Sequence, residues 1–205
     1  MKRRLENYIE LIGGVNTTRM DRDHAEKFIE YYDIEAFDSD FNHTNGFVDD
    51  STFINSERIS ERIQDRVVEE GDVVINSSLM LATIVSKENS GKVLSLNYIK
   101  VKFKGSRLDK RYFLYLFNEN FEVQKAKSIG AQGIAIQRIT TKTIMDIEVP
   151  ILPIETQRKI GKAYSMSLRL QSDLERKKEL IKEATKTVLE ERIEEYNERE
   201  DLGKK

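Results

Sequence analysis

The chain has 205 residues, of which 39% are hydrophobic and 34% are charged, and its formal net charge is −2. This length fits one globular domain with an appendage, or two small units. A membrane span is excluded, because the uninterrupted apolar stretches are only a few residues long. The absence of cysteine excludes a disulfide framework and a cysteine-based zinc site, and it fits a reducing cytoplasm.

Charge is distributed unevenly along the chain. Residues 1–50 hold 6 basic and 12 acidic side chains, whereas residues 87–142 hold 12 basic and 4 acidic ones. Residues 151–205 are nearly balanced, with 13 basic and 12 acidic side chains. A surface that binds a polyanion needs only local positive charge. Segment 87–142 is therefore a candidate for DNA contact, and the alternative is an ordinary solvated face.

The first half of the chain predicts one short helix and then strands. The spacing of apolar residues predicts an amphipathic helix over 21–33. Turn-forming residues are frequent over 34–56, which we expect to be turn-rich. The segment 71–78 predicts a turn and a strand, and the β-branched residues of 81–87 predict a neighbouring strand.

A third strand is predicted over 94–103, because polar and apolar residues alternate at its end. One face carries Tyr98, Lys100, Lys102 and Lys104, and the other carries Ile99, Val101 and Phe103. A helix is expected over 108–121, a tight glycine loop over 130–133, and β-branched strands with short turns over 134–149.

The stretch VPILPIETQRKIG, residues 149–161, contains both prolines of the chain. Pro150 is expected to end the last strand, since proline cannot donate to a strand ladder. Pro153 suits the start of a helix, where its missing N–H costs nothing. Glu155 then lies in the first turn, where the helix dipole favours an acidic side chain. The stretch therefore predicts a stiff elbow between a domain and a helix.

A long helix is predicted after this elbow, because residues 154–200 contain no proline and only one glycine. Apolar positions recur at alternating steps of three and four, as in one coiled-coil seam. The seam consists of Ile160, Ala163, Ser167, Leu170, Leu174, Lys177, Ile181, Ala184 and Val188. About 45 helical residues would form a rod of roughly 68 Å. Such a helix needs a partner helix from a second copy or another protein, unless it folds back over its own domain.

Together these elements predict an α+β fold. It would comprise one globular mixed α/β domain over 1–150, a long coiled-coil helix over 151–200 and a tail over 201–205. No catalytic signature is present: the two histidines, His24 and His43, lack metal-ligand spacing, and no phosphate loop or nucleophile elbow occurs. No glycine motif for adenosylmethionine occurs either. We therefore expect a non-catalytic binding module without metal or cofactor.

The stretch VPILPIETQRKIG resembles the junction that ends the target-recognition domain in DNA specificity subunits of type I restriction-modification systems. The matching residues are Ile147, Val149, Pro150, Pro153, Glu155, Gln157 and Ile160. Leu152 replaces a frequent proline of that junction, and Thr156 replaces a frequent glutamate. EEGDVVINSS at 69–78 and RYFLYLFN at 111–118 also resemble segments of the family, so that the likeness extends over roughly residues 60–190.

This resemblance implies a half-length subunit, with one recognition domain where a full subunit carries two. Two copies would pair through antiparallel helices and present their domains around a two-fold axis. The pair would direct a separate adenine methyltransferase (M) subunit, and possibly a restriction (R) subunit, to a bipartite palindrome in double-stranded DNA. The M subunit would bring adenosylmethionine and flip the adenine. The alternatives are a DNA-binding module of another defence system, a coiled-coil scaffold, or an enzyme whose site the sequence does not reveal.

The candidate DNA-contacting residues combine the basic strand face, the following helix start and polar loops. Lysine and arginine suit phosphates, and glutamine and arginine can read bases in the major groove. The candidates are Thr17, Thr18, Arg19, Asn76, Ser77, Ser78, Lys100, Lys102, Lys104, Arg107, Lys110, Arg111, Gln132, Gln137, Arg138, Thr140 and Thr141. The helix positions expected to meet a partner are Ile160, Ala163, Leu170, Leu174, Ile181, Ala184 and Val188.

Overall fold

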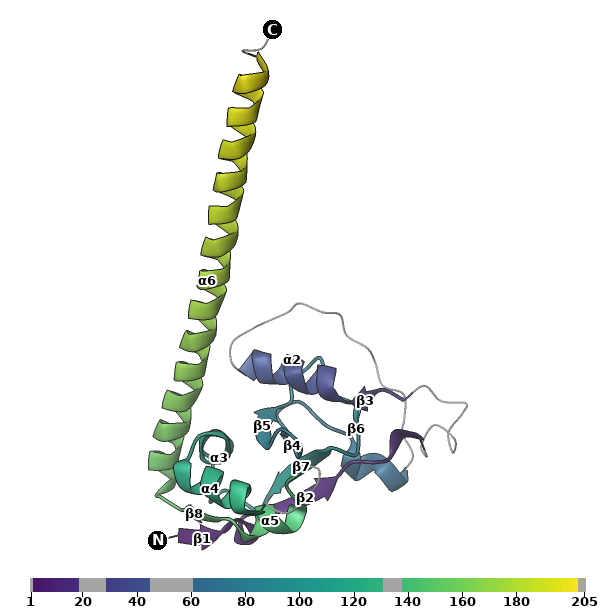
Figure 1. Cartoon of the computed structure of the whole chain (residues 1–205). Coiled ribbons are helices and arrows are strands. Elements are labelled where there is room, and N and C mark those ends of the chain that lie inside the picture. The colour runs from purple at the N-terminus through teal and green to yellow at the C-terminus, as the bar shows by residue number, and fades with distance from the viewer. Residues whose placement is uncertain (1, 19–28, 45–60, 131–137, 203–205) are drawn as a thin grey trace.

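The computed structural model of the chain describes residues 2–18, 29–44, 61–130 and 138–202. It contains an α+β domain from which a single long helix projects, as the sequence predicted (Figure 1). None of the helices that the structure describes is long and apolar enough to cross a membrane.

The centre of the domain is a four-stranded antiparallel sheet. Its strands are β2 (Ile9–Gly13), β7 (Tyr98–Phe103), β4 (Val73–Asn76) and β5 (Leu81–Ile84), in that spatial order. Each neighbouring pair is antiparallel. The strands predicted over 71–78, 81–87 and 94–103 are thus confirmed over 73–76, 81–84 and 98–103, whereas residues 96 and 97 form a turn.

Successive side chains of β7 point to opposite faces of the sheet and therefore enter two different hydrophobic cores. Ile99 and Val101 join the larger core, which also contains Phe113 and Leu116. Tyr98 lies in a second core with Phe37 and Val74. Helices pack against both faces of the sheet, so that part of each face is shielded from solvent.

Two small sheets complete the strand structure. Strand β1 (Lys2–Arg4) pairs antiparallel with β8 (Glu148–Pro150), which joins the N-terminus to the proline junction. Strand β3 (Tyr31–Tyr32) pairs parallel with β6 (Val93–Leu94). The prediction of a helix over 21–33 is therefore wrong at its end, and residues 21–28 lie outside the described residues.

Helix α2 (Ile34–Thr44) occupies a segment that the sequence predicted to be turn-rich, so that this prediction is wrong over 34–44. The Asp33 carboxylate accepts the N–H groups of Glu35 and Ala36, both at 3.1 Å, and thereby starts the helix. Asp40 is fully buried and accepts the Tyr32 hydroxyl at 2.6 Å. Asp40, which lies in the segment expected to be turn-rich, thus anchors a helix that Asp33 caps.

The helices on the other face of the sheet are α3 (Lys110–Asn118), α4 (Phe121–Gly130) and α5 (Thr141–Asp146). Helix α3 confirms the expected helix, and Asp109 caps it by accepting two backbone N–H groups at 3.0 Å. Helix α4 was not predicted. Helix α5 replaces part of the strand expected over 134–149, because the Thr140 hydroxyl caps a helical turn instead.

The buried Lys127 ties α4 to the sheet. Its ammonium group donates to the carbonyl oxygens of Met80, at 2.8 Å, and Phe117, and lies 4.3 Å from the centre of the Phe117 ring. Burial lowers the pKa of Lys127 to about 8. One of the 12 basic side chains of segment 87–142 therefore belongs to the interior rather than to a binding surface.

The proline junction has the predicted geometry. Strand β8 ends at Pro150, and helix α6 (Ile154–Leu202) begins directly after Pro153, whose carbonyl accepts the N–H groups of Thr156 and Gln157. The first turns of α6 cross α3 closely at Gly161. A Cβ atom at Gly161 would lie 2.7 Å from the backbone nitrogen of Tyr112.

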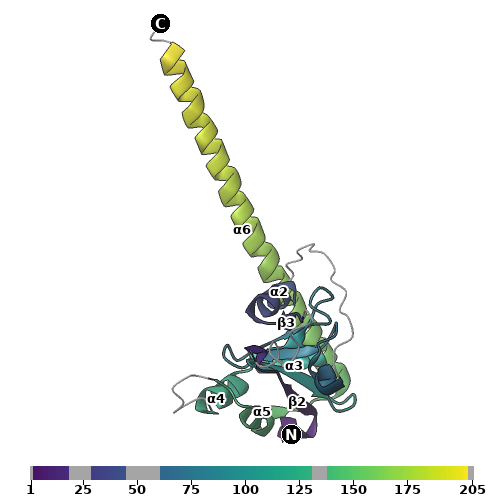
Figure 2. The same cartoon turned by 90° about the vertical axis from the view of Figure 1, so that its right-hand side faces the viewer.

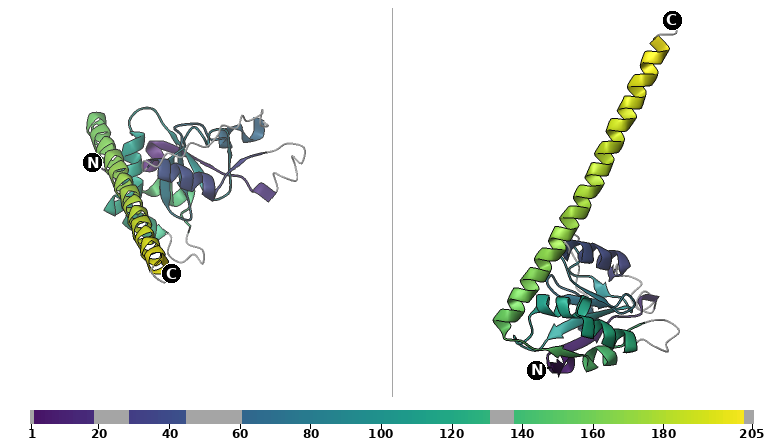
Figure 3. Two further views of the ribbon diagram at one scale, coloured as in Figure 1. Left: turned by 90° about the horizontal axis from the view of Figure 1, so that it is seen from above. Right: turned by 60° about the vertical axis from the view of Figure 1, so that its left-hand side comes forward.

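The rest of α6 stands away from the domain (Figures 2 and 3). Beyond Ser172, every residue of α6 whose burial the structure describes is exposed. With 49 residues, the helix is about 73 Å long. The alternative of a helix folded back along its whole length over its own domain is therefore wrong.

Gln157 holds the base of α6 in place. Its side chain is fully buried; the amide nitrogen donates to the carbonyl oxygens of Arg107 and Leu152 at 2.9 and 2.7 Å, and the amide oxygen accepts the N–H of Asp109 at 3.0 Å. All hydrogen-bonding groups of the amide except one lone pair are thus used within the junction.

Replacing Gln157 with Ala should lower the free energy of unfolding by about 2–4 kcal/mol, since three backbone groups of the partly buried junction lose their partner. Gln171→Ala on the same helix removes only an exposed hydrogen bond to Ser167 and should cost less than about 0.5 kcal/mol. Urea unfolding of the two variants measures the difference, and equal stability would contradict this role of Gln157.

Candidate nucleic-acid interface

Three of the predicted DNA-contacting stretches meet around one turn, Ser95–Asn97, which we call the 95–97 loop. Val15, two residues before Thr17, forms a bridge with Ser95. Both the N–H and the hydroxyl of Ser77 donate to the Asn97 carbonyl oxygen, at 2.9 and 2.8 Å. Segments that are far apart in the sequence therefore form one continuous loop surface.

Arg138 attaches the third stretch to this loop. Its Nε atom donates to the Ser77 hydroxyl at 2.9 Å, and its guanidinium group also donates to the Leu96 carbonyl oxygen. The N–H of Ile139 donates to the Ser77 carbonyl oxygen at 2.9 Å. These contacts use part of the guanidinium that the sequence assigned to reading a base, so that Arg138 also serves to hold two loops together.

Asn76 and Ser77 lie next to this surface but are buried, with 2% and 0% of their area exposed. The Asn76 side-chain oxygen accepts the N–H groups of Ser78 and Leu79, both at 3.0 Å. These two side chains are therefore not exposed for direct contact with DNA in this structure. Their polar groups fold the loop and present Ser78.

The exposed rim of this surface includes residues that the sequence did not single out. Leu79 and Leu96 are about half exposed, at 50% and 51%, and Asn97 is exposed beside Leu96. Among the predicted residues, Ser78 and Thr18 are exposed and Thr17 is half-buried. The signal for this turn was an asparagine between two apolar runs, since Asn favours turns.

The glycine pair before Thr17 allows the chain to approach the 95–97 loop. Gly14 donates its N–H to the Tyr98 carbonyl oxygen at 3.0 Å. A Cβ atom at Gly14 would lie 2.6 Å from the Leu94 carbonyl oxygen and closer still to that of Ser95. Gly13 has nothing within 4 Å of such an atom. Only the second glycine is therefore required by packing.

The lysines of β7 differ from one another. Lys100 is half-buried, lies 2.6 Å from the Asp72 carboxylate and donates to the Val67 carbonyl oxygen at 2.9 Å. Lys104 donates to the Glu6 carbonyl oxygen at 3.0 Å. Lys102 is exposed and lies opposite Glu10 in the sheet register. Among the three lysines predicted to suit phosphates, Lys100 therefore has its charge neutralised by a close ion pair.

Arg107, Lys110 and Arg111 lie beside the base of α6. Lys110 donates to the Gly71 carbonyl oxygen at 2.6 Å, and Arg111 packs against Gly161. Arg111 also lines a cavity of about 580 Å³ between the domain and α6, which we call the root groove. These three residues thus mark the domain–helix junction and belong to a different part of the fold from the 95–97 loop.

The remaining candidates have separate positions. Thr140 is exposed and caps α5, and Thr141 is the exposed first residue of that helix. Arg19, Gln132 and Gln137 lie outside the described residues. Within the described ranges, no group of three or more His, Asp or Glu side chains could hold a metal ion.

Comparison with known proteins assigns the chain to a family. The type I restriction modification DNA specificity domain matches residues 5–184. The chain belongs to this family. The match includes the domain, the 95–97 loop and most of α6. The search of curated proteins gave no significant match.

One solved specificity subunit has a similar fold. The HsdS subunit from Thermoanaerobacter tengcongensis aligns with 85% of this specificity-domain chain at 16% identity and a TM-score of 0.50. The type I restriction-modification S subunit from M. genitalium aligns with 81% of it at 13% identity and a TM-score of 0.46. The alignments cover only 38% of each of those two chains. The specificity-domain chain therefore spans well under half the length of these subunits.

Replacing Gly14 with Ala should force the 13–18 segment away from the 95–97 loop and lower the free energy of unfolding by about 2–4 kcal/mol. Gly13→Ala, the matched control, should change it by less than about 1 kcal/mol. Urea unfolding gives both values, and amide hydrogen exchange at Val15 should rise only in the Gly14 variant. Equal behaviour of the two variants would contradict the close packing at Gly14.

Proposed function

We propose that this chain is the DNA-reading half of a type I restriction-modification specificity subunit. Two copies would pair, bind double-stranded DNA and direct a separate adenine methyltransferase subunit, together with a restriction subunit where present, to a bipartite site. The chain itself would carry out no catalysis and would hold no cofactor. The family match over residues 5–184 carries this proposal, and the unpartnered surface of α6 supports its dimeric form.

The two sides of α6 have different environments. On the domain side, Gln157, Gly161 and Ser172 are buried, and Tyr164 packs against the larger core. Ile160 also packs against this core, because the first turns of α6 lie over α3. The seam that remains available runs from Ala163 to Val188.

The seam side leaves large apolar residues in water. Leu170 and Leu174 are 60% and 58% exposed, and Ile181 and Val188 are 67% and 56% exposed. A row of this length on one face of a helix is typical of a coiled-coil interface. Because the domain packs on the other face, a second α6 can occupy the seam without displacing the domain.

The DNA-contacting surface that we propose is the rim of the 95–97 loop. Ser78, Asn97 and Thr18 supply exposed polar groups there, and Leu96 supplies an apolar surface suited to a thymine methyl group. Lys102 is an exposed basic residue on β7 and suits a phosphate. Thr140, Thr141, Arg107, Lys110 and Arg111 remain further candidates.

The positive charge of segment 87–142 alone does not support the proposal of DNA binding. The basic side chains of segment 87–142 are dispersed over several elements: Lys127 is buried, and Lys100 is paired with Asp72. A dispersed charge was the expectation for a coiled-coil scaffold, which we retain as the alternative. Salt-dependent binding to duplex DNA separates the two functions, because a scaffold would not bind.

Replacing Leu170, Leu174 and Ile181 together with Lys should convert a dimer into monomers, since three charges would enter the seam on each helix. Glu175→Lys and Glu179→Lys also add lysines, but on the side of α6 away from the seam, and should leave the dimer intact. Sedimentation at micromolar concentration measures the mass. A monomeric parent protein, or a seam variant with unchanged mass, would contradict the pairing.

The methylated DNA target should be a bipartite palindrome, because two identical domains around a two-fold axis read identical, inverted half-sites. Deleting residues 174–180, one heptad, should bring the domains closer by roughly 10 Å. The unread spacer should then shorten by about 3 base pairs, while the half-sites stay the same. Sequencing of methylated adenines in cells with the chain and its methyltransferase tests this. An asymmetric target would instead indicate pairing with a different half-subunit.

A further inference from the structure

We propose that the buried Lys127 is a positioning residue for DNA reading, which holds the turn between β4 and β5 in the conformation that presents Ser78 and Leu79 to DNA. This turn comprises residues 77–80, and we call it the 77–80 turn. The inference rests on the proposed DNA-contacting surface and deepens it. It assigns Leu79 as a specificity-determining residue and names the interior group that orients it.

The tip of the 77–80 turn faces solvent, whereas its two ends are anchored. Ser78 is exposed and Leu79 is 50% exposed. Ser77 is buried, and Met80 packs against the larger core. A leucine beside a serine hydroxyl offers two kinds of contact to a base edge, namely apolar surface for a thymine methyl group and a hydrogen bond. The tip therefore has the chemistry of a reading element.

The backbone of Met80 has an unusual conformation. Within the described residues, Met80 is the one residue other than glycine with a positive φ, at 56°. Residues with a Cβ atom adopt this left-handed region rarely, because Cβ then lies too close to the backbone. Such a conformation persists where surrounding contacts enforce it, and it is frequent at functional sites. The 77–80 turn therefore depends on a restraint from outside its own sequence.

Lys127 supplies this restraint from α4. Its ammonium group donates to the Met80 carbonyl oxygen at 2.8 Å and to the Phe117 carbonyl oxygen, and lies 4.3 Å from the centre of the Phe117 ring. The Phe117 carbonyl lies in the last turn of α3, where helix carbonyls carry partial negative charge. The lysine thus joins the strained residue of the turn to the end of a helix that packs in the larger core.

Packing alone does not account for a lysine at this position. Lys127 is 2% exposed, and its burial lowers its pKa to about 8, because the charged form is disfavoured away from water. An apolar side chain of similar length, such as methionine, would fill the same space without this cost. The two carbonyl contacts are therefore what distinguishes lysine from an apolar residue here.

Other side chains hold the segments on either side of Met80. The Asn76 side-chain oxygen accepts two N–H groups of the turn, both at 3.0 Å. The Asn118 amide exchanges two hydrogen bonds with the backbone of Ala82, at 2.8 and 2.9 Å. Met80 lies between these two fixed points, and Lys127 holds its carbonyl group. Loss of the ammonium group should therefore change the turn while leaving the strands in place.

Binding to duplex DNA tests the role of Lys127. The full chain is first used to enrich a pool of random-sequence duplexes, and its affinity is then measured for the enriched duplex and for a scrambled one. Lys127→Met should weaken binding to the enriched duplex by roughly tenfold or more, because the reading contacts are displaced. Binding to the scrambled duplex and the salt dependence should not change, since a buried lysine contacts no phosphate.

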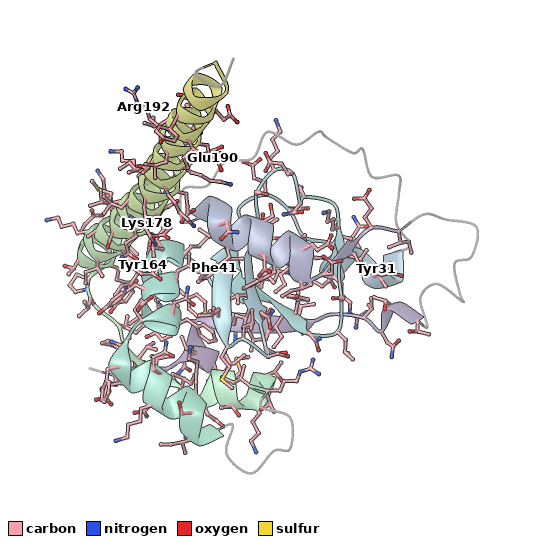
Figure 4. All side chains as sticks on the ribbon, turned by 45° about the horizontal axis from the view of Figure 1, so that its top comes forward. Tyr31, Phe41, Tyr164, Lys178, Glu190 and Arg192 are labelled. Carbon is pink, nitrogen blue, oxygen red and sulfur yellow. The ribbon has the colours of Figure 1, made fainter. Side chains whose placement is uncertain are left out.

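A rescue and a control separate positioning from general stability. Lys127→Met/Met80→Gly should recover much of the lost affinity, because glycine adopts a positive φ without strain. Val123→Ala also alters a buried residue of α4 and should lower the urea midpoint without changing the sequence preference. The far half of α6, with Glu190 and Arg192, stands away from the domain (Figure 4). All these variants should therefore keep the mass of the parent.

Leu79 tests the turn in a variant whose folding is not at risk, because the side chain is half exposed. Leu79→Ser should lower the affinity for the enriched duplex by roughly fivefold or more, or change the sequence that is enriched. Ile129→Ser makes a similar change at an exposed residue of α4 and should alter neither.

The outcomes separate this inference from the proposed function. A parent chain that enriches no sequence would overturn both. If the parent reads a sequence but Leu79→Ser or Lys127→Met binds it unchanged, DNA binding stands and the inference is wrong. A weaker salt dependence in Lys127→Met would indicate a phosphate contact and contradict positioning. Equal loss in Val123→Ala, or no recovery with Met80→Gly, would contradict it as well.

Discussion

The arrangement of the whole molecule depends on one buried amide. Gln157 uses both ends of its side chain to join the proline junction, the start of α3 and the first turn of α6. A buried amide is costly unless its polar groups are satisfied, so that the three hydrogen bonds define one orientation rather than a range of them. Gly161 adds a steric condition one turn later, because α3 and α6 approach too closely there for a side chain. The direction in which α6 leaves the domain follows from these two residues.

The parts of the fold that sequence reasoning identified are those with local causes. Alternation in β7, the cap at Asp109 and the two fixed φ angles at Pro150 and Pro153 each act within a few residues. Helix α2 escaped prediction because its stability depends on distant partners. Asp40 accepts hydrogen bonds from Tyr32, Ser86 and Asn89, and a sequence does not reveal that these groups will meet. The acidic residues around Asp40 therefore indicated a turn when considered alone.

The candidate interface could also be predicted from the sequence only in part. The sequence identified the stretches that converge on the 95–97 loop, but it could not separate side chains that face outward from those that hold the loop. Asn76 and Ser77 lie at the end of a strand, where both arrangements are common, and burial decides between them. Lys100 shares a strand face with Lys102, yet Asp72 neutralises only the first. Exposure and ion pairing are tertiary properties, so residue type alone predicted the region and not the contacts.

Helix α6 crosses α3 closely at Gly161 and extends far beyond this point, so that a small rotation at the crossing moves the far end of α6 by several ångströms. Over a helix of about 73 Å, a rotation of roughly 3° at the base moves the far end by about 3.4 Å, the rise of one base pair. A loosely attached helix would therefore vary in the position of its far end relative to the domain, even though its length is constant. The three hydrogen bonds of the Gln157 amide and the missing side chain at Gly161 restrict this rotation, so that the position of the far end of α6 is determined at its base.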